Sequence, residues 1–248
     1  MKHKYLLKQD SQDLRDHIFC SAIFKAETHL PTKVDLRKKC SPVVNQGNLG
    51  SCTANAIASG LREYLLVNKE VKWEQLSRLF LYYEERLLEG TVSEDSGAEI
   101  RDGMKVLNKI GVCPEADWPY VEATFTNPPT NKMTADAVPF KIAEYHRITS
   151  LAQLKAALAE GLPVVIGIEV YDSFENDDVA NTGVVPMPDT STEQDLGGHA
   201  VLVVGYDDAK SQLIVRNSWG ITWGDLGYFY LPYDYYNKYS SDCWTSKG

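Results

Sequence analysis

The spacing of apolar residues changes character about half-way along the chain, and this change constrains the fold more than any other feature. In the first half, apolar side chains recur every three to four residues, which is typical of a helix with one buried face. In the second half, short runs rich in Val, Ile and Tyr lie between turn residues, which is typical of strands. Helices followed by strands predict an α+β protein with two lobes.

The two patterns predict where the elements lie. Helices are expected over 51–67, 75–88 and 100–109, and a shorter one over 151–159. Strands are expected over 141–148, 162–170, 199–206, 213–217 and 227–231. Turn formers predict a surface loop over 31–50 and a long crossing loop after Thr124. A single domain is thus expected over 30–248, with a helical lobe over about 45–125 and a β lobe over about 140–231.

Composition and charge narrow the class of partner. The formal net charge is −9 and the pI is about 5.1, so phosphate-rich partners are repelled and nucleic-acid binding is not expected. No apolar run reaches the roughly 18 residues that span a bilayer. The start of the chain also lacks the roughly 7–15 apolar residues of a secretory signal. We therefore expect no membrane span, and a cytoplasmic or non-classically exported protein.

The cysteine pattern argues against a disulfide framework and against a metal. The chain has five cysteines, an odd number without close pairs. No CxxC or His-x-x-His spacing suggests zinc, and the acidic run 175–178 lacks the alternating ligands of a calcium loop, so it is interpreted as a solvated loop. Neither a metal nor a cofactor is expected. Most of the thiols are expected to be free and inert, in a reducing compartment.

Cys52 is the exception among these cysteines, because it falls in the first turn of the helix expected over 51–67. Free backbone N–H groups and the helix dipole favour a negative charge at that end. A thiolate is such a charge and is the nucleophilic form of cysteine. Ser51 is the expected N-cap of the helix. Taken alone, the placement also fits a structural thiol.

A nucleophilic cysteine needs a base and a group that orients the base. His199 follows two glycines at the start of an apolar strand, and Gly198 leaves room for a substrate backbone. Asn217 ends another strand, and its amide can accept the imidazole N–H without taking the proton. The other histidines lack such contexts and are interpreted as surface or extension residues: His3, His17, His29 and His146.

Three blocks in this order resemble the papain-like (cathepsin-type) cysteine peptidases. The blocks are Gln46-Gly-Asn-Leu-Gly-Ser-Cys52, Gly198-His199-Ala200 and Asn217-Ser-Trp-Gly220, and the resemblance runs from Pro31 to about Leu231. His199 and Asn217 follow Cys52 by 147 and 165 residues, and the first separation matches the roughly 130–150 residues typical of such enzymes. The resemblance implies a helical left lobe and an antiparallel β-barrel-like right lobe with the active-site cleft between them.

The resemblance also implies a role for each matching residue. Cys52 and His199 would form the thiolate–imidazolium pair, and Gln46 would bind the oxyanion with the Cys52 backbone N–H. Asn217 would orient His199, and Trp219 would shield that hydrogen bond from water. The substrate backbone would lie along two further glycines, Gly50 and Gly97.

Two positions depart from the family pattern. Leu49 stands where the family commonly has a cysteine, and Thr53 where it has an aromatic residue. The disulfide partner expected in the segment 95–98 is missing as well. Their joint absence fits a relative that works without this disulfide, and Thr53 makes the neighbouring subsite different.

Residues 1–29 precede the Leu30-Pro31 break and are expected to be a short N-terminal extension, which could serve as a pro-segment. Such an extension could run through the cleft and block it sterically. In a covalent version, the regulatory residue would be Cys20, whose thiol could form a reversible mixed disulfide with Cys52. The segment 172–198 is a second candidate for a loop that limits access to the cleft.

Hydrolysis of peptide bonds is the activity that the resemblance implies, with a peptide or protein as substrate and a monomer as the active unit. Two alternatives remain open. The same Cys–His pair could transfer an acyl group to an amine, as a transglutaminase or ligase does. The chain could also be a catalytically silent binding homologue, although the intact set of Gln46, Cys52, His199 and Asn217 argues against that interpretation.

Overall fold

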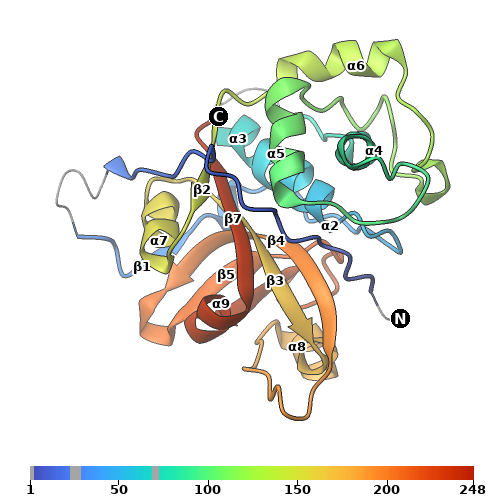
Figure 1. Cartoon of the computed structure of the whole chain (residues 1–248). Helices are drawn as coiled ribbons and strands as arrows, with labels where there is room; N and C mark the ends of the chain where they lie inside the picture. Colours follow the sequence, from blue (N-terminus) through green and yellow to red (C-terminus); the bar gives the residue numbers. More distant parts are fainter. Residues whose placement is uncertain (1–2, 23–28, 69–72) are drawn as a thin grey trace.

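The computed structural model describes residues 3–22, 29–68 and 73–248. The helices up to residue 137 gather on one side of the molecule, and a large twisted sheet lies on the other with three shorter helices beside it, as Figure 1 shows. The α+β organisation predicted from the change in periodicity is therefore confirmed. The N-terminal segment crosses the molecule along the boundary between the two sides.

The helical side is built on one long helix that begins at Cys52. It comprises α2 (Cys52–Ala54), the π-helical stretch η2 (Asn55–Arg62) and α3 (Glu63–Asn68). Beside it lie α4 (Arg78–Glu89) and α5 (Ile100–Lys109). All three helices expected in this half are therefore present. In α4 the Ser77 side chain accepts the Phe80 N–H at the start, and Gly90 ends the helix in the left-handed conformation.

Shorter helices complete the chain. The expected helix over 151–159 is α7 (Leu151–Ala159). Three others were not expected: α6 (Asn131–Ala137), α8 (Asp177–Thr182) and α9 (Tyr233–Tyr239). Single 3₁₀ turns are η1 (Arg37–Lys39), η3 (Glu122–Thr124), η4 (Val138–Phe140), η5 (Asp172–Glu175) and η6 (Asp208–Lys210). The loop expected after Thr124 is thus wrong in part, because Thr130 caps α6.

The sheet has seven antiparallel strands in the order β2-β7-β3-β4-β5-β6, and β1 pairs with β4. The five expected strands correspond to β2 (Tyr145–Ile148), β3 (Val164–Tyr171), β4 (Asp195–Asp207), β5 (Gln212–Arg216) and β6 (Tyr228–Pro232). Two strands were not expected: β1 (Lys33–Asp35), inside the expected surface loop, and β7 (Ser240–Ser246), beyond the expected end of the β lobe. β7 is stabilised by pairing with both β2 and β3, which its polar start does not indicate.

The long helix and β4 meet where the catalytic candidates lie. Gly60 faces this strand, and a Cβ atom there would come within 3.1 Å of the Leu202 side chain. The missing side chain lets the helix approach the sheet closely. Because Cys52 starts the helix and His199 lies in β4, this close packing brings the helix start next to the strand.

Candidate active site

Cys52 is completely buried at the start of α2. Its sulfur lies within hydrogen-bonding reach of the backbone N–H of Ala200, the residue that follows His199 in β4. Ser51 occupies the N-cap position, but its side chain does not cap the helix as expected. Its hydroxyl instead lies 2.6 Å from the Tyr120 hydroxyl. The first-turn N–H groups are therefore not capped by Ser51 and can face a negative charge beside the sulfur.

His199 and Asn217 form a buried pair. The His199 Nε2 atom lies 2.9 Å from the Asn217 Oδ1 atom. This oxygen also accepts the Ser218 backbone N–H at 2.8 Å, which fixes which end of the amide faces the ring. Nε2 must then carry the hydrogen, and in the neutral ring Nδ1 is unprotonated. Nδ1 is buried and has no hydrogen-bond partner within the described part of the chain, so it is free to take a proton.

Gln46 is held by two hydrogen bonds from its side chain. Its Nε2 atom donates to the Leu49 carbonyl at 3.0 Å, and its Oε1 atom accepts the Ser218 hydroxyl at 2.6 Å. The Gln46 backbone N–H donates to the Ser218 carbonyl at 2.8 Å. Ser218 thus joins Gln46 to Asn217. Sequence reasoning did not single out Ser218, although it lies inside the Asn-Ser-Trp-Gly block.

Trp219 lies over the histidine and is almost fully buried. Its ring stacks on the His199 ring, with centroids 5.0 Å apart and planes inclined by 21°. Trp223 and Phe174 meet the Trp219 ring edge-on. The aromatic cluster excludes water from the His199–Asn217 hydrogen bond, and a hydrogen bond is stronger in such a low-dielectric environment.

The N-terminal segment runs over these residues. The Leu7 N–H donates to the Gly198 carbonyl at 3.0 Å, and the Leu6 side chain lies against Gly50. A Cβ atom at Gly97 would lie 1.7 Å from the Leu6 carbonyl oxygen, so only glycine allows this approach. All three glycines expected to border a substrate therefore border the segment instead.

His3 and Tyr5 lie over the Trp219 and His199 rings. The His3 ring stacks on Trp219 with centroids 3.7 Å apart, and the Tyr5 ring meets the His199 ring edge-on at 5.9 Å. His3 and Tyr5 both contact the Glu175 carboxylate. His3 is an extension residue as expected, but it is partly buried against Trp219. In the expected solvated loop, residues 176–178 are exposed, whereas Glu175 contacts residues more than 165 positions away, which no local pattern indicates.

Burial sets the protonation of the covered pair. Desolvation lowers the pKa of His199 to about 4, partly offset by the hydrogen bond to Asn217. Desolvation raises the pKa of the Cys52 thiol to about 12, against hydrogen bonds from the Ala200 and Thr53 backbone. Both groups are therefore neutral at pH 7 while residues 3–8 cover them.

The comparisons with known proteins decide the family. The model of the papain family of cysteine proteases matches residues 30–243. The chain belongs to this family. It is therefore a papain-family cysteine peptidase, a hydrolase, with the papain-like fold.

Three relatives illustrate the range of similarity to this papain-family chain. Xylellain, a cysteine protease from Xylella fastidiosa, is 39% identical with a TM-score of 0.89, and the match covers 100% of this chain and 98% of that one. A peptidase C1-like protein of Acanthamoeba polyphaga mimivirus is 40% identical, covering 89% of this chain and 78% of the viral protein. Cysteine proteinase 1 of Entamoeba histolytica is 31% identical, and the match covers 80% of this chain and 62% of the Entamoeba protein.

A hydrogen-bonded link stands where the papain family commonly has a disulfide. The Asp95 carboxylate accepts the Gly50 N–H at 2.9 Å and the Tyr82 hydroxyl at 2.6 Å. The same Tyr82 hydroxyl accepts the Gly97 N–H at 3.1 Å. Gly50 and Gly97, which both contact Leu6, are thus tied together through Asp95 and Tyr82, without the cysteine that Leu49 replaces. Sequence reasoning missed this link.

The remaining cysteines lie apart from Cys52 and His199. Cys20 is exposed, and its thiol is unpaired, as are the thiols of Cys40, Cys113 and Cys243. Phe19, beside Cys20, bonds to the backbone of β2, whereas it is Leu6 that lies against Gly50, two residues before Cys52. Within the described ranges, no cluster of three or more His, Cys, Asp or Glu could hold a metal. The same part of the chain contains no helix long and apolar enough to cross a membrane.

Proposed function

We propose that the chain hydrolyses peptide bonds through an acyl-thioenzyme, with Cys52 as nucleophile and His199 as base. The His199–Asn217 pair carries this proposal, because it leaves Nδ1 buried, unprotonated and without another partner. Nδ1 takes the thiol proton as sulfur attacks the carbonyl carbon. The C–N bond then breaks, and His199 protonates the leaving amine. Water next attacks the thioester with His199 as base, which releases the acid and restores the thiol.

The oxyanion of each tetrahedral intermediate needs donors placed in advance. Gln46 Nε2 has a second hydrogen beyond the one it gives to Leu49, and its orientation is held by Ser218. We assign this hydrogen and the Cys52 backbone N–H to the oxyanion. Losing one such donor typically lowers kcat by about 10²–10³. Ser218→Ala is expected to reduce kcat with little change in KM, because it frees the Gln46 amide to rotate.

Two alternatives use the same geometry, and a labelling experiment separates them. A thiol-reactive peptidyl epoxide should label the wild-type chain and not Cys52→Ala, whereas a silent binding homologue would not be labelled. Product analysis in the presence of an added amine separates the enzymes. Free acid as the main product supports hydrolysis, and an amide with the added amine supports acyl transfer.

We further propose that the N-terminal segment restrains this peptidase. Residues 3–8, which we call the occluding residues, contact the borders of the cleft through Gly50, Gly97 and Gly198. While they are in place, Cys52 and His199 have no exposed surface. A peptide substrate cannot reach the sulfur while this segment is in place. Because the segment belongs to the same chain, its effective concentration at the cleft is high.

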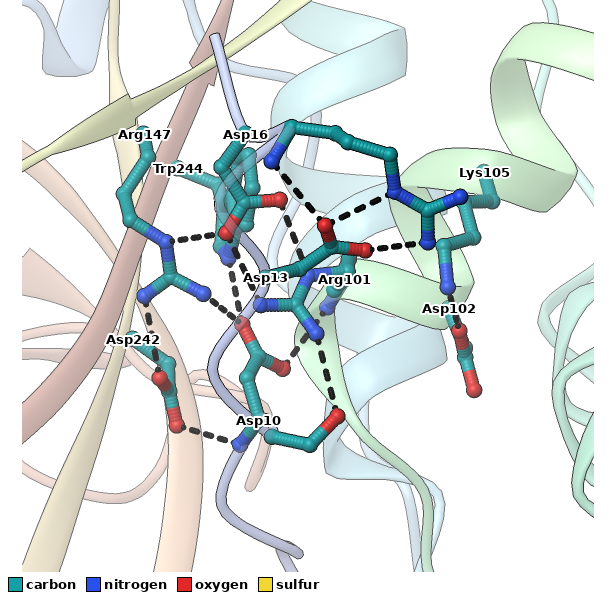
Figure 2. Close-up of polar contacts among 11 residues, drawn as sticks. Asp10, Asp13, Asp16, Arg101, Asp102, Lys105, Arg147, Asp242 and Trp244 are labelled. Atoms are coloured by element: carbon teal, nitrogen blue, oxygen red, sulfur yellow. Dashed lines mark hydrogen bonds and ion pairs between the residues drawn. The ribbon is translucent and has the colours of Figure 1, made fainter. Parts of the chain in front are cut away.

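A second part of the segment, residues 10–19, fastens it to both lobes, and we call it the anchor. Figure 2 shows Asp10 and Asp16 between Arg101 of α5 and Arg147 of β2. The Asp10 carboxylate accepts a hydrogen bond from the Arg147 guanidinium at 2.9 Å and another from the Trp244 indole N–H at 2.7 Å. The Asp16 carboxylate accepts two hydrogen bonds from the Arg101 guanidinium, at 3.1 and 2.8 Å, and one from the Arg147 guanidinium at 2.9 Å.

Backbone contacts and burial extend the anchor to Phe19. The Arg147 N–H donates to the His17 carbonyl, and the Phe19 N–H donates to the Arg147 carbonyl, each at 2.8 Å. Phe19 is 2% exposed and belongs to the core, and the Asp10 side chain is fully buried. Gln9 between the two parts is exposed. The anchor is therefore part of the folded body, and only the occluding residues need to leave.

A cut at Gln9 tests this restraint. A recognition site for a sequence-specific protease, placed at Gln9 of the full chain, is cut after folding, and the product is called the cut chain. We expect the rate of epoxide labelling at Cys52 to rise at least about tenfold, because the competent fraction rises. Cys52→Ala cut in the same way is the control. Equal labelling before and after the cut would rule out steric occlusion.

The covalent version of the restraint has its own test. The contacts support steric occlusion, since the described residues over Cys52 are 3–8 and Cys20 lies beyond the anchor. A mixed disulfide would require the segment to move. Mass spectrometry of a non-reduced digest, with and without peroxide, detects a Cys20–Cys52 peptide if it forms. Its absence under oxidation would eliminate the covalent version and leave the steric one intact.

A further inference from the structure

Three carboxylates border the cleft, and we call them the acidic rim. They are Glu89 at the end of α4, Asp95 in the following loop and Glu175 in η5. Each of them contacts a basic side chain of the occluding residues. Lys8 Nζ lies 2.5 Å from Glu89, Lys4 Nζ lies 2.6 Å from Asp95, and His3 Nδ1 lies 3.2 Å from Glu175.

Two carboxylates of the rim are held in place by groups outside the segment. Asp95 accepts the Gly50 N–H and the Tyr82 hydroxyl. Glu89 accepts the Glu99 backbone N–H at 2.9 Å through its other oxygen. These bonds do not need residues 3–8, so both charges stay in position when the cleft opens. Such preorganised charges can recognise an incoming ligand without reordering.

Burial is uneven across these ion pairs. The Lys4 and Lys8 side chains are 49% and 37% exposed, whereas Asp95 and Glu89 are 13% and 10% exposed. The carboxylates are thus built into the border, and the lysines reach them from solvent. Between the basic residues, Tyr5 covers His199, Leu6 lies on Gly50, and Leu7 contacts the backbone at Gly198. The segment therefore presents cations on both sides of an apolar centre.

We propose that the acidic rim determines substrate class, so that this peptidase selects peptides with Lys or Arg on both sides of an aromatic or aliphatic stretch. The inference rests on the proposed function, because it concerns the same cleft. A set of like charges beside a catalytic cleft raises the association rate of oppositely charged ligands and disfavours ligands that carry the same charge. A partly exposed pair contributes modestly, about two- to fivefold in affinity, so the selection depends on several pairs acting together.

The experiment measures binding without catalysis. The cut chain carrying Cys52→Ala is titrated with a fluorescent peptide of the sequence of residues 2–9, and with a copy in which Lys2, Lys4 and Lys8 are norleucine and His3 is glutamine. We expect the basic peptide to bind at least about tenfold more tightly at low salt. We expect the difference to shrink strongly in about 1 M salt, where the screening length is roughly 3 Å.

Matched variants locate the effect on the rim. Glu89→Gln keeps the acceptor for the Glu99 N–H, and Glu175→Gln removes a charge whose described partners include His3 and Tyr5. Each variant is expected to bind the basic peptide about two- to fivefold more weakly and to bind the neutral peptide with unchanged affinity. Glu74→Gln, an exposed carboxylate outside the rim, is the control and should change neither.

The outcomes separate this inference from the proposed function. Equal affinity for the two peptides, or an equal loss for both in the rim variants, overturns the selection of basic substrates. A cut chain with Cys52 intact that is not labelled by epoxide and cleaves neither peptide refutes the peptidase instead. Faster cleavage of the basic peptide by that chain, lost in Glu89→Gln, supports both.

Discussion

At the scale of single residues, burial keeps charge away from the reacting pair. His199 is surrounded by Asn217, Trp219, Tyr5 and the Cys52 side of the cleft, and its pKa falls to about 4. A hydrated imidazole has a pKa of about 6.5. The covered state therefore binds a proton on His199 less readily than an uncovered state does, and this difference makes occlusion depend on pH.

The sign of this pH dependence follows from linkage. Above about pH 6.5 His199 is neutral in both states and does not oppose occlusion. As pH falls from about 6.5 towards 4, the uncovered state gains the proton first, so acid favours release of residues 3–8. Glu175 also makes acid favour release. Burial raises the pKa of its carboxyl, but the hydrogen bonds from His3 and Tyr5 outweigh burial, so the pKa in the covered state is lowered. The predicted change in the occlusion equilibrium is roughly 10²-fold.

Epoxide labelling of the full chain at pH 7 and pH 4.5 measures this change, with each rate divided by that of the cut chain at the same pH. The ratio should rise on acidification. A ratio that stays flat, or that falls, would contradict the assigned burial of His199.

Glu85 is a second residue whose charge is opposed by burial. It lies in α4 and is completely buried, with Oε2 accepting the Thr53 hydroxyl at 2.7 Å. Oε1 has no partner within the described part of the chain. Desolvation raises its pKa well above the ordinary value, against the hydrogen bond from Thr53. Thr53, where the family has an aromatic residue, thus contacts a buried acid whose neutral form is favoured by burial.

Glu85→Gln should change the pH dependence of stability. A raised pKa in the folded state favours folding below the unfolded pKa, and this contribution is lost as pH rises. The neutral amide has no such loss, so the variant should gain stability relative to wild type between pH 5 and pH 9. Thermal unfolding across this range is the measurement. A constant difference in Tm would indicate that Glu85 is not the group that titrates.

At the scale of elements, the Asp95–Tyr82 link connects the loop before α2 to the loop after α4. The helices themselves were predictable, since their apolar periodicity is local, and α5 and α7 begin and end as expected. The link was not predictable, because it joins residues that no periodic pattern relates. The family resemblance indicated that a disulfide was missing there, but not what replaces it.

Tyr82→Phe should loosen the borders of the cleft. The substitution removes the hydroxyl that accepts the Gly97 N–H and donates to Asp95. Loss of such a buried hydrogen-bonding group typically costs about 1–3 kcal/mol. In the cut chain we expect KM for a peptide substrate to rise severalfold and kcat to change little, because Cys52 and His199 are untouched. Steady-state kinetics measure both, and a fall in kcat alone would contradict the assigned role. Tyr83→Phe, the neighbouring tyrosine in α4, is the control.

At the scale of the whole molecule, the N-terminal segment joins the lobes while it covers the cleft. Residues 1–29 were expected to be an extension, and their described part consists of the occluding residues and the anchor. Removing all 29 residues would leave Arg101, Arg147 and the Trp244 indole without their Asp10 and Asp16 partners. A chain that begins at Leu30 is therefore expected to be less stable, not simply more active.

Asp10→Ala tests the anchor in the full chain. It leaves the Trp244 N–H unpaired, whereas Arg147 keeps Asp16 and Asp242, so we expect a loss of about 1–3 kcal/mol. This corresponds to a fall in Tm of roughly 2–12 °C for a chain of this size. Asp13→Ala, which removes an exposed pair with Arg15, is the control and should change Tm little. Equal Tm values for the two variants would show that the anchor does not stabilise the fold.

Local sequence determined most helices and five of the strands, because periodicity and turn residues act over a few positions. It also determined the catalytic candidates, since Gln46, Cys52, His199 and Asn217 lie in short motifs. The tertiary structure alone decided that β7 completes the sheet, that residues 3–8 lie in the cleft, and that the acidic rim faces the segment's cations. These features depend on contacts between distant residues, such as His3 and Glu175, which lie 172 positions apart, and no local pattern encodes such pairs.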